Sequence, residues 1–146
     1  MEIPEYVTKE EVKRVCGELG IRDWSVVEEP DVQTEEARKV LEIVNTEGMD
    51  IALEEFRAGL EVELEHGTRF KDANVTNNHP VLTGLIVLAH LKESLDYYRL
   101  LEVAELEGDL LKALARGDAA KAKSYYARLA RARIALREAE LARLEG

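Results

Sequence analysis

The fold is decided by one long apolar stretch at residues 80–107, PVLTGLIVLAHLKESLDYYRLLEVAELE. Its leucine, isoleucine and tyrosine residues recur at the three- and four-residue spacing of an α-helix and fall on two stripes. Pro80 suits the first turn of a helix, because the N–H that proline lacks would have no partner there. A helix that is apolar on two sides packs against neighbours on both, so we expect this one to be central.

Capping and breaking residues divide the rest of the chain into further helices. No stretch alternates apolar and polar residues as a strand would, and alanine, leucine, glutamate and arginine favour helix. The predicted helices are 8–20 (or 8–17), 34–45, 50–66, 80–107, a short one after Gly108, and a long one from about 118 to 144. The sequence therefore predicts an all-α single-domain bundle of four to six helices around an antiparallel pair. Its parts are the N-terminal helices (1–48), the core pair (50–107) and the basic C-terminal helices (109–146).

The charge is unevenly distributed along the chain. Of 146 residues, 30 are acidic and 20 are basic, which gives a formal net charge of −10. Residues 1–108 hold 11 basic and 25 acidic side chains, whereas residues 109–146 hold 9 basic and 5 acidic ones. An acidic molecule repels phosphate at long range, so a nucleic-acid accessory protein that uses the basic helix is only the third-ranked hypothesis. We expect the basic helix to pack along the acidic body, or along that of a second subunit.

Several features predict a cytoplasmic protein. The first residues lack the basic and apolar regions of a signal peptide, and the longest apolar run, 81–91, is too short to span a bilayer. Cys16 is the single cysteine, so no intrachain disulfide forms, and we expect an ordinary half-buried thiol. No interaction with a membrane is expected.

Two short patterns mirror each other on neighbouring predicted helices, Glu63-x-x-His66 and His90-x-x-Glu93. A spacing of three residues places each carboxylate and imidazole on one face of a helix, on a stripe that is otherwise apolar. Ionisable groups on a buried stripe are costly unless they are paired or bind a metal. Two imidazoles and two carboxylates would suit zinc, iron or manganese, and an open coordination position could activate water for hydrolysis.

The loop between the two helices would lie over this site and bring polar groups to it. Asp72, Asn74 or His79 would approach from the loop, and Tyr97 would offer a hydrogen bond from one turn beyond Glu93. A two-metal site of the carboxylate-bundle type would need further bridging glutamates. The candidates are Glu36, Glu47 and Glu55, and none stands out, so a single metal is the simpler hypothesis.

A second hypothesis needs no metal. His66 lies at a helix C-terminus, where the helix dipole favours an imidazolium, and His90 could simply hydrogen-bond Glu63. The Glu/His set would then be a structural network in a non-enzymatic assembly or adaptor module, with the helix from Asp118 mediating self-association. The chain has no phosphate-binding glycine loop and no Ser/His/Asp arrangement, so we expect no nucleotide cofactor. Whether the protein is an enzyme stays open, as do its substrate and its oligomeric state.

A group of short motifs resembles a small family of bacterial and phage proteins that is catalogued as a domain of unknown function. The motifs are GLEVELEHG (59–67), NVTN (74–77), TG (83–84), AHL (89–91) and DYY (96–98). The resemblance covers about residues 53–100 and implies that Glu63, His66, Asn74, Thr76, His90 and Tyr97 belong to one unit. It implies no activity. The family pattern often has aspartate at the place of His79 and lysine at the place of Leu85, so this chain departs from it there.

Overall fold

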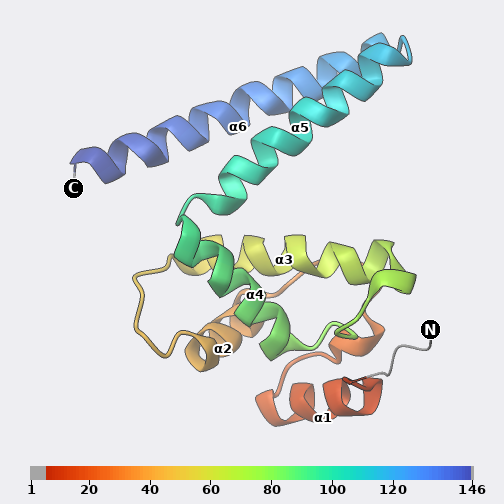
Figure 1. The fold of residues 1–146 in the computed structure, drawn as a ribbon, viewed down its shortest axis with the longest axis vertical. Helices are drawn as coiled ribbons and strands as arrows, with labels where there is room; N and C mark the ends of the chain where they lie inside the picture. The colour runs from red at the N-terminus through yellow and green to blue at the C-terminus, as the bar shows by residue number, and fades with distance from the viewer. Residues whose placement is uncertain (1–5, 146) are drawn as a thin grey trace. The chain divides into compact units, whose positions relative to one another are not determined.

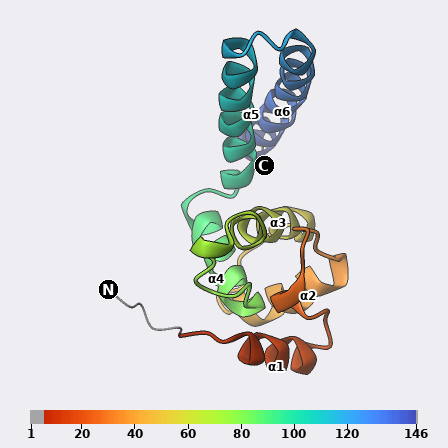
Figure 2. The same ribbon diagram turned by 90° about the vertical axis from the view of Figure 1, so that its right-hand side faces the viewer.

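The computed structural model describes residues 6–145, and every regular element within them is a helix (Figures 1 and 2). The elements are α1 (Lys9–Leu19), η1 (Trp24–Val26), α2 (Thr34–Val44), α3 (Leu53–Arg69), η2 (Lys71–Ala73), α4 (Pro80–Glu93), α5 (Tyr97–Ala115) and α6 (Ala119–Glu145). The predicted all-α class with four to six helices is confirmed. The chain divides into two compact units, residues 1–92 and 93–146, which we describe separately as the N-terminal and C-terminal units. None of the helices in residues 6–145 has both the length and the apolar character that crossing a bilayer requires.

Several helix boundaries differ from the predicted ones. The predicted helix 80–107 is two helices, because α4 ends at Glu93 and α5 begins at Tyr97. Between them, the Ser94 hydroxyl accepts a hydrogen bond from the N–H of Asp96, a local turn that competes with helix. The helix α5 then continues through Gly108 to Ala115, since a single glycine costs a helix only about 1 kcal/mol.

The ends of the earlier helices also needed correction in part. The helix α1 begins after Thr8, and its C-cap is Gly20, which has the left-handed conformation. Gly20 was one of the two ends predicted for this helix. The N-cap of α2 is Gln33, one residue before the predicted start, and its N–H donates to Glu36. The helix α3 starts at Leu53 and runs past Gly67 to Arg69, so neither Asp50 nor Gly67 bounds it.

The core of the N-terminal unit lies where α2, α3 and α4 meet, and α1 lies on one side of it (Figure 2). Its fully buried side chains include Val12, Trp24, Val40, Phe56, Leu60 and Val87. The helix α4 approaches α2 closely at Gly84, where an added Cβ would lie 2.5 Å from Val40 Cγ1. Only glycine therefore permits this packing without a shift of the neighbouring side chain.

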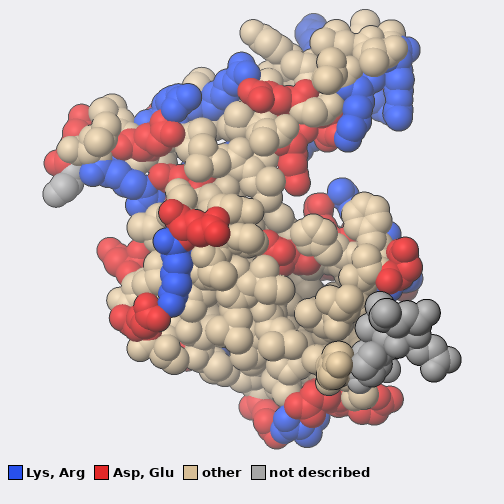
Figure 3. All heavy atoms as spheres, in the orientation of Figure 1, with Lys and Arg blue, Asp and Glu red and all other residues tan. Residues whose placement is uncertain are grey.

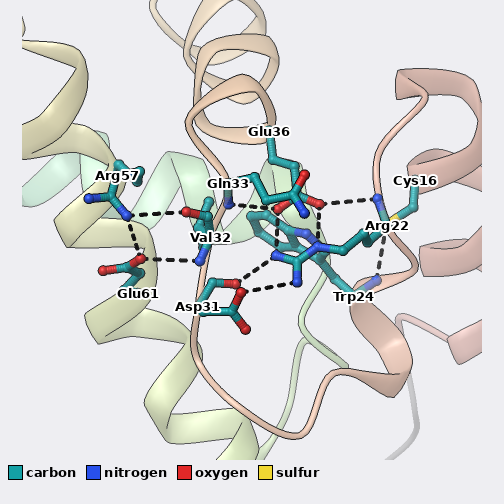
Figure 4. A network of polar contacts seen from close by, with 9 residues as sticks. All are labelled: Cys16, Arg22, Trp24, Asp31, Val32, Gln33, Glu36, Arg57 and Glu61. Carbon is teal, nitrogen blue, oxygen red and sulfur yellow. Dashed lines mark hydrogen bonds and ion pairs between the residues drawn. The ribbon is translucent and has the colours of Figure 1, made fainter.

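An ion pair between buried Glu36 and partly exposed Arg22 fixes the connection between α1 and α2 (Figure 4). The carboxylate of Glu36 is 3% exposed and accepts hydrogen bonds from the Arg22 guanidinium, at 2.7 and 2.9 Å. It also accepts from the backbone N–H groups of Arg22 and Gln33. Burial alone would raise the pKa of Glu36, but these hydrogen bonds outweigh it and hold the pKa below its ordinary value.

A second polar contact joins the same connection to α3 (Figure 4). The Glu61 carboxylate accepts from the N–H of Val32 at 3.1 Å and from Arg57 Nη1 at 2.8 Å. Arg57 also donates to the carbonyl of Val32. The segment between η1 and α2 is therefore tied to the helices on either side of it, although it has no regular structure of its own.

The C-terminal unit is an antiparallel helical hairpin formed by α5 and α6 (Figure 1). Leu106, Leu129 and Ala132 form its core, with Val103, Leu110 and Tyr125 packed around them. At the open end, Asp96 accepts hydrogen bonds from Arg143 at 2.6 and 2.8 Å and from Arg99 at 3.0 Å. The hydrogen bonds from Arg143 are the main reason why the pKa of Asp96 lies below its ordinary value.

We expect Gly84→Ala to destabilise the N-terminal unit by about 1–3 kcal/mol, because the new methyl group would overlap Val40. Urea unfolding followed by the fluorescence of Trp24, the single tryptophan, measures this directly. Gly108→Ala is the matched control, since its Cβ meets nothing within 4 Å. It should stabilise α5 by about 0.5–1 kcal/mol through helix propensity. Equal effects of the two changes would contradict the packing described at Gly84.

We expect Glu36→Gln to lower the free energy of unfolding at pH 7 by about 1–3 kcal/mol, because it removes the buried charge that pairs with Arg22 and leaves the guanidinium only the exposed carboxylate of Asp31. The folded-state pKa of Glu36 is lowered, so its contribution is complete above the unfolded-state pKa and is lost as the pH falls through the folded-state value. The difference between wild type and variant should therefore shrink as the pH falls from 7 towards about 3. If this difference in the free energy of unfolding stays constant over this pH range, the charge of Glu36 does not stabilise the folded state.

Candidate functional site

Glu63 lies between two imidazoles from different helices. Its side chain projects from α3 and is 11% exposed. One carboxylate oxygen, Oε2, lies 3.6 Å from Nδ1 of His66 on the next turn of α3, and Oε1 lies 3.6 Å from Nε2 of His90 on α4. The structure thus brings together three of the four side chains in the mirrored sequence patterns, and Glu63 links α3 to α4.

The fourth residue of the predicted metal site, Glu93, is exposed at the last position of α4 and is grouped with the C-terminal unit. Within residues 6–145, no group of three or more His, Cys, Asp and Glu side chains is arranged to hold a metal ion. The imidazoles of His66 and His90 face different oxygens of Glu63 rather than a shared coordination point. Binding of zinc, iron or manganese at these residues therefore remains a prediction from the sequence, without support from the geometry.

The glutamates considered as bridging ligands have other contacts. Glu36 is buried against Arg22, as described above, and Glu47 pairs with Lys92 on α4 at 2.6 Å. Both interactions join residues far apart in the sequence, 14 and 45 positions respectively. A search of the sequence for short motifs could not have found them.

A cavity of about 270 Å³ opens beside Glu63 in the N-terminal unit. The helix α3 supplies Glu63, His66 and Gly67 to its wall, and α4 supplies Thr83 and Ile86. The remaining wall is the segment between these helices, with Phe70, Ala73, Asn74, Val75 and Thr76. The wall is mostly apolar, and its polar groups include the Glu63 carboxylate and the His66 imidazole.

The loop that forms this wall is fixed by asparagine side chains. Asn78 is buried and donates to the carbonyl of Trp24, and Asn77 donates to the carbonyl of Val7 at 2.6 Å. Both have positive φ, a conformation that asparagine tolerates better than most residues. The loop also packs tightly against α3, since a Cβ on Gly67 would lie 1.8 Å from Asn78 Oδ1. The role of Gly67 is therefore to leave room for the side chains of the loop, and α3 continues past it to Arg69.

The residues predicted to surround the site have different roles. Asn74 lines the cavity, and its side chain donates to the Gly67 carbonyl at 3.4 Å. Asp72 and His79 do not line it. The His79 ring instead accepts a hydrogen bond from the Leu82 N–H at the start of α4, and burial lowers its pKa. Tyr97 belongs to the C-terminal unit, where its ring packs edge-on against Tyr98.

Three apolar residues of the cavity were not identified from the sequence. Phe70, Val75 and Ile86 are 56%, 82% and 39% exposed, although each is large and apolar. Phe70 and Val75 flank the polar turn, where an apolar residue has no helical neighbour to pack against. Their lack of helical neighbours was the one sequence feature that could have pointed to a binding surface, because such surfaces often expose apolar side chains around a polar group.

Comparison with known proteins gives a family without a function. Residues 12–107 match the model of a family described as protein of unknown function (DUF5661), which covers well over half of the chain. The match includes the N-terminal helices, which lay outside the resemblance seen in the sequence motifs. No curated protein and no solved structure matches the chain.

Proposed function

The chain belongs to the DUF5661 family, whose function is unknown, and from the geometry of its own residues we propose that it is a binding protein for small organic cations. The proposed ligand group is an alkylammonium or a guanidinium, bound in the cavity beside Glu63. The observation that carries this proposal is a nearly buried carboxylate in the wall of a mostly apolar cavity.

The lining of the cavity suits both parts of such a ligand. A carboxylate has about four lone-pair positions, so Glu63 can accept hydrogen bonds from a ligand while it contacts His66 and His90. The side chains of Val75 and Ile86 would cover an alkyl stem. Phe70 lies in the same wall, and the face of an aromatic ring attracts a cation by about 0.5–1 kcal/mol at an exposed position.

The charge of the N-terminal unit favours a cation over an anion. Residues 1–92 carry 20 acidic and 10 basic side chains, so this unit accounts for the whole net charge of −10. On the face of this unit that Figure 3 shows, acidic side chains are seen at several places, mainly around its edge. A field of this sign raises the local concentration of cations and repels phosphates and carboxylates.

The size of the cavity limits the ligand to a small group. Its 270 Å³ lies just below the range of about 300–1,000 Å³ that is usual for drug-sized ligands. One ammonium or guanidinium group on a short alkyl chain is therefore the appropriate size. Such a group occurs both in free amines and in the lysine and arginine side chains of other proteins, and the experiment below separates these two sources.

Titration of the full chain with n-butylammonium and n-butylguanidinium, followed by calorimetry or by NMR, tests the proposal. We expect saturable binding of at least one of them and no binding of the neutral n-pentanol. Glu63→Gln should weaken binding by tenfold or more, because it removes the charge at the site. A short peptide that contains one lysine or arginine, with blocked ends, should bind more tightly than the free amine if the natural ligand is a protein.

Glu65→Gln is the matched control, since Glu65 lies two residues away on α3 and pairs with Arg69 outside the cavity. Its binding should equal that of wild type. Absence of saturable binding, or equal binding by Glu63→Gln, would refute the proposal. Stoichiometric zinc binding that is lost in both His66→Ala and His90→Ala would refute it in favour of the metal hypothesis.

A further inference from the structure

Three large apolar side chains stand at the open side of the cavity beside Glu63. Phe70, Val75 and Ile86 all line the cavity, yet between 39% and 82% of each remains exposed. Each therefore faces the cavity with one part and the surrounding water with the rest. We call these three residues the apolar rim. Single exposed apolar residues need no explanation, but three around one nearly buried carboxylate are typical of an interaction surface.

Hydrogen bonds of the backbone hold the part of the rim that comes from the loop. The N–H of Phe70 donates to the His66 carbonyl at 3.0 Å, which joins it to the last turn of α3. The N–H of Ala73 donates to the Phe70 carbonyl at 2.8 Å, and that of Val75 donates to the Ala73 carbonyl at 3.0 Å. The third member, Ile86, lies within α4. Because the rim is already ordered, its ordering costs a bound partner little free energy.

The Glu63 carboxylate in the cavity wall determines which group of a partner enters the cavity. A cation that reaches this nearly buried group must give up most of its water. A guanidinium is more weakly hydrated than an ammonium, and its planar fork matches the two oxygens of a carboxylate. Phe70 in the same wall also favours arginine, since arginine is found over aromatic faces more often than lysine.

A free guanidinium compound that fits the cavity would leave the apolar rim in water. The cavity of about 270 Å³ holds one guanidinium on a short alkyl chain, and such a ligand has no further atoms to lie on the outer parts of Phe70 and Val75. An arginine in a polypeptide differs, because its backbone and its neighbouring side chains stay outside the cavity and contact the rim. An arginine in a central pocket, surrounded by contacts that exclude water, is typical of a protein interface.

We propose that this site docks another protein, which inserts one arginine side chain into the cavity towards Glu63 and lays apolar neighbours of that arginine on the apolar rim. The proposal rests on the cation binding proposed above and names the source of the cation. The occupant is a protein segment with an arginine between apolar residues. It matches the site by opposite charge inside the cavity and by apolar surface outside it.

Calorimetric titration of the full chain with short peptides tests the proposal. The probe is a pentapeptide with blocked ends, in which arginine lies between two leucines and a glycine lies at each end. A second pentapeptide has serine in place of both leucines. We expect the leucine peptide to bind more tightly than the serine peptide by about tenfold or more, because only leucine side chains cover the apolar rim. A third peptide, with lysine in place of arginine between the leucines, should bind more weakly than the first.

Val75→Ser should remove most of the preference for the leucine peptide over the serine peptide, since Val75 is the most exposed member of the rim. A substitution at so exposed a position should leave the fold intact. Val26→Ser is the matched control, because Val26 is 68% exposed in the same unit and lies outside the cavity wall. This variant should retain the full preference.

The result for n-butylguanidinium separates this proposal from the one on which it rests. If n-butylguanidinium binds but the leucine and serine peptides bind equally, cation binding at Glu63 stands and docking of a protein on the rim is overturned. Equal binding of the arginine and lysine peptides, or a preference that Val75→Ser leaves unchanged, also overturns it. If neither n-butylguanidinium nor any peptide binds, both proposals fail.

Discussion

The contact of the Glu63 carboxylate with two imidazoles is the interaction on which the site depends. His66 comes from the same helix and His90 from α4, so the carboxylate both orders one turn of α3 and joins the two helices. An ionisable group that is 11% exposed would be costly without such neighbours. The cavity beside it exists because α3, α4 and the loop between them meet at this point without filling the space.

Tight packing elsewhere in the N-terminal unit keeps these elements in place. Gly84 allows α4 to lie directly against Val40 of α2, and Gly67 allows the asparagine side chains of the loop to lie against α3. The ion pair of buried Glu36 with Arg22 holds the chain that leads into α2. These contacts are close in space but distant in sequence, and those at Gly67 and Gly84 hold the loop and α4, two of the elements that form the cavity wall.

The helices and part of the site could be predicted from the sequence, because their signals are local. Thr8 identifies the start of α1 correctly, Gly20 was one of the two predicted ends, and the three-residue spacing of Glu63 and His66 places them on one face of α3. The break at Ser94–Asp96 was missed, because the apolar stripe continues through it and because the ion pair that holds Asp96 comes from Arg143, 47 residues further along. The isolation of Phe70 beside the polar turn indicated an exposed apolar residue, but its place in the cavity wall depends on how the loop returns to α3. The mirrored pattern suggested a metal site with Glu93 as a ligand. The spacing of residues within a motif cannot show whether side chains from two helices point to one common position.

The ring nitrogens of the three histidines offer the most direct test of the proposed binding site. Their ¹⁵N chemical shifts can be followed by NMR while n-butylguanidinium is added to the full chain. His66 and His90 contact Glu63, whereas His79 lies outside the cavity wall and serves as an internal reference. We predict that the shifts of His66 and His90 change together and saturate while those of His79 stay constant. Unchanged shifts at His66 and His90, or equal changes at all three histidines, would contradict cation binding at Glu63.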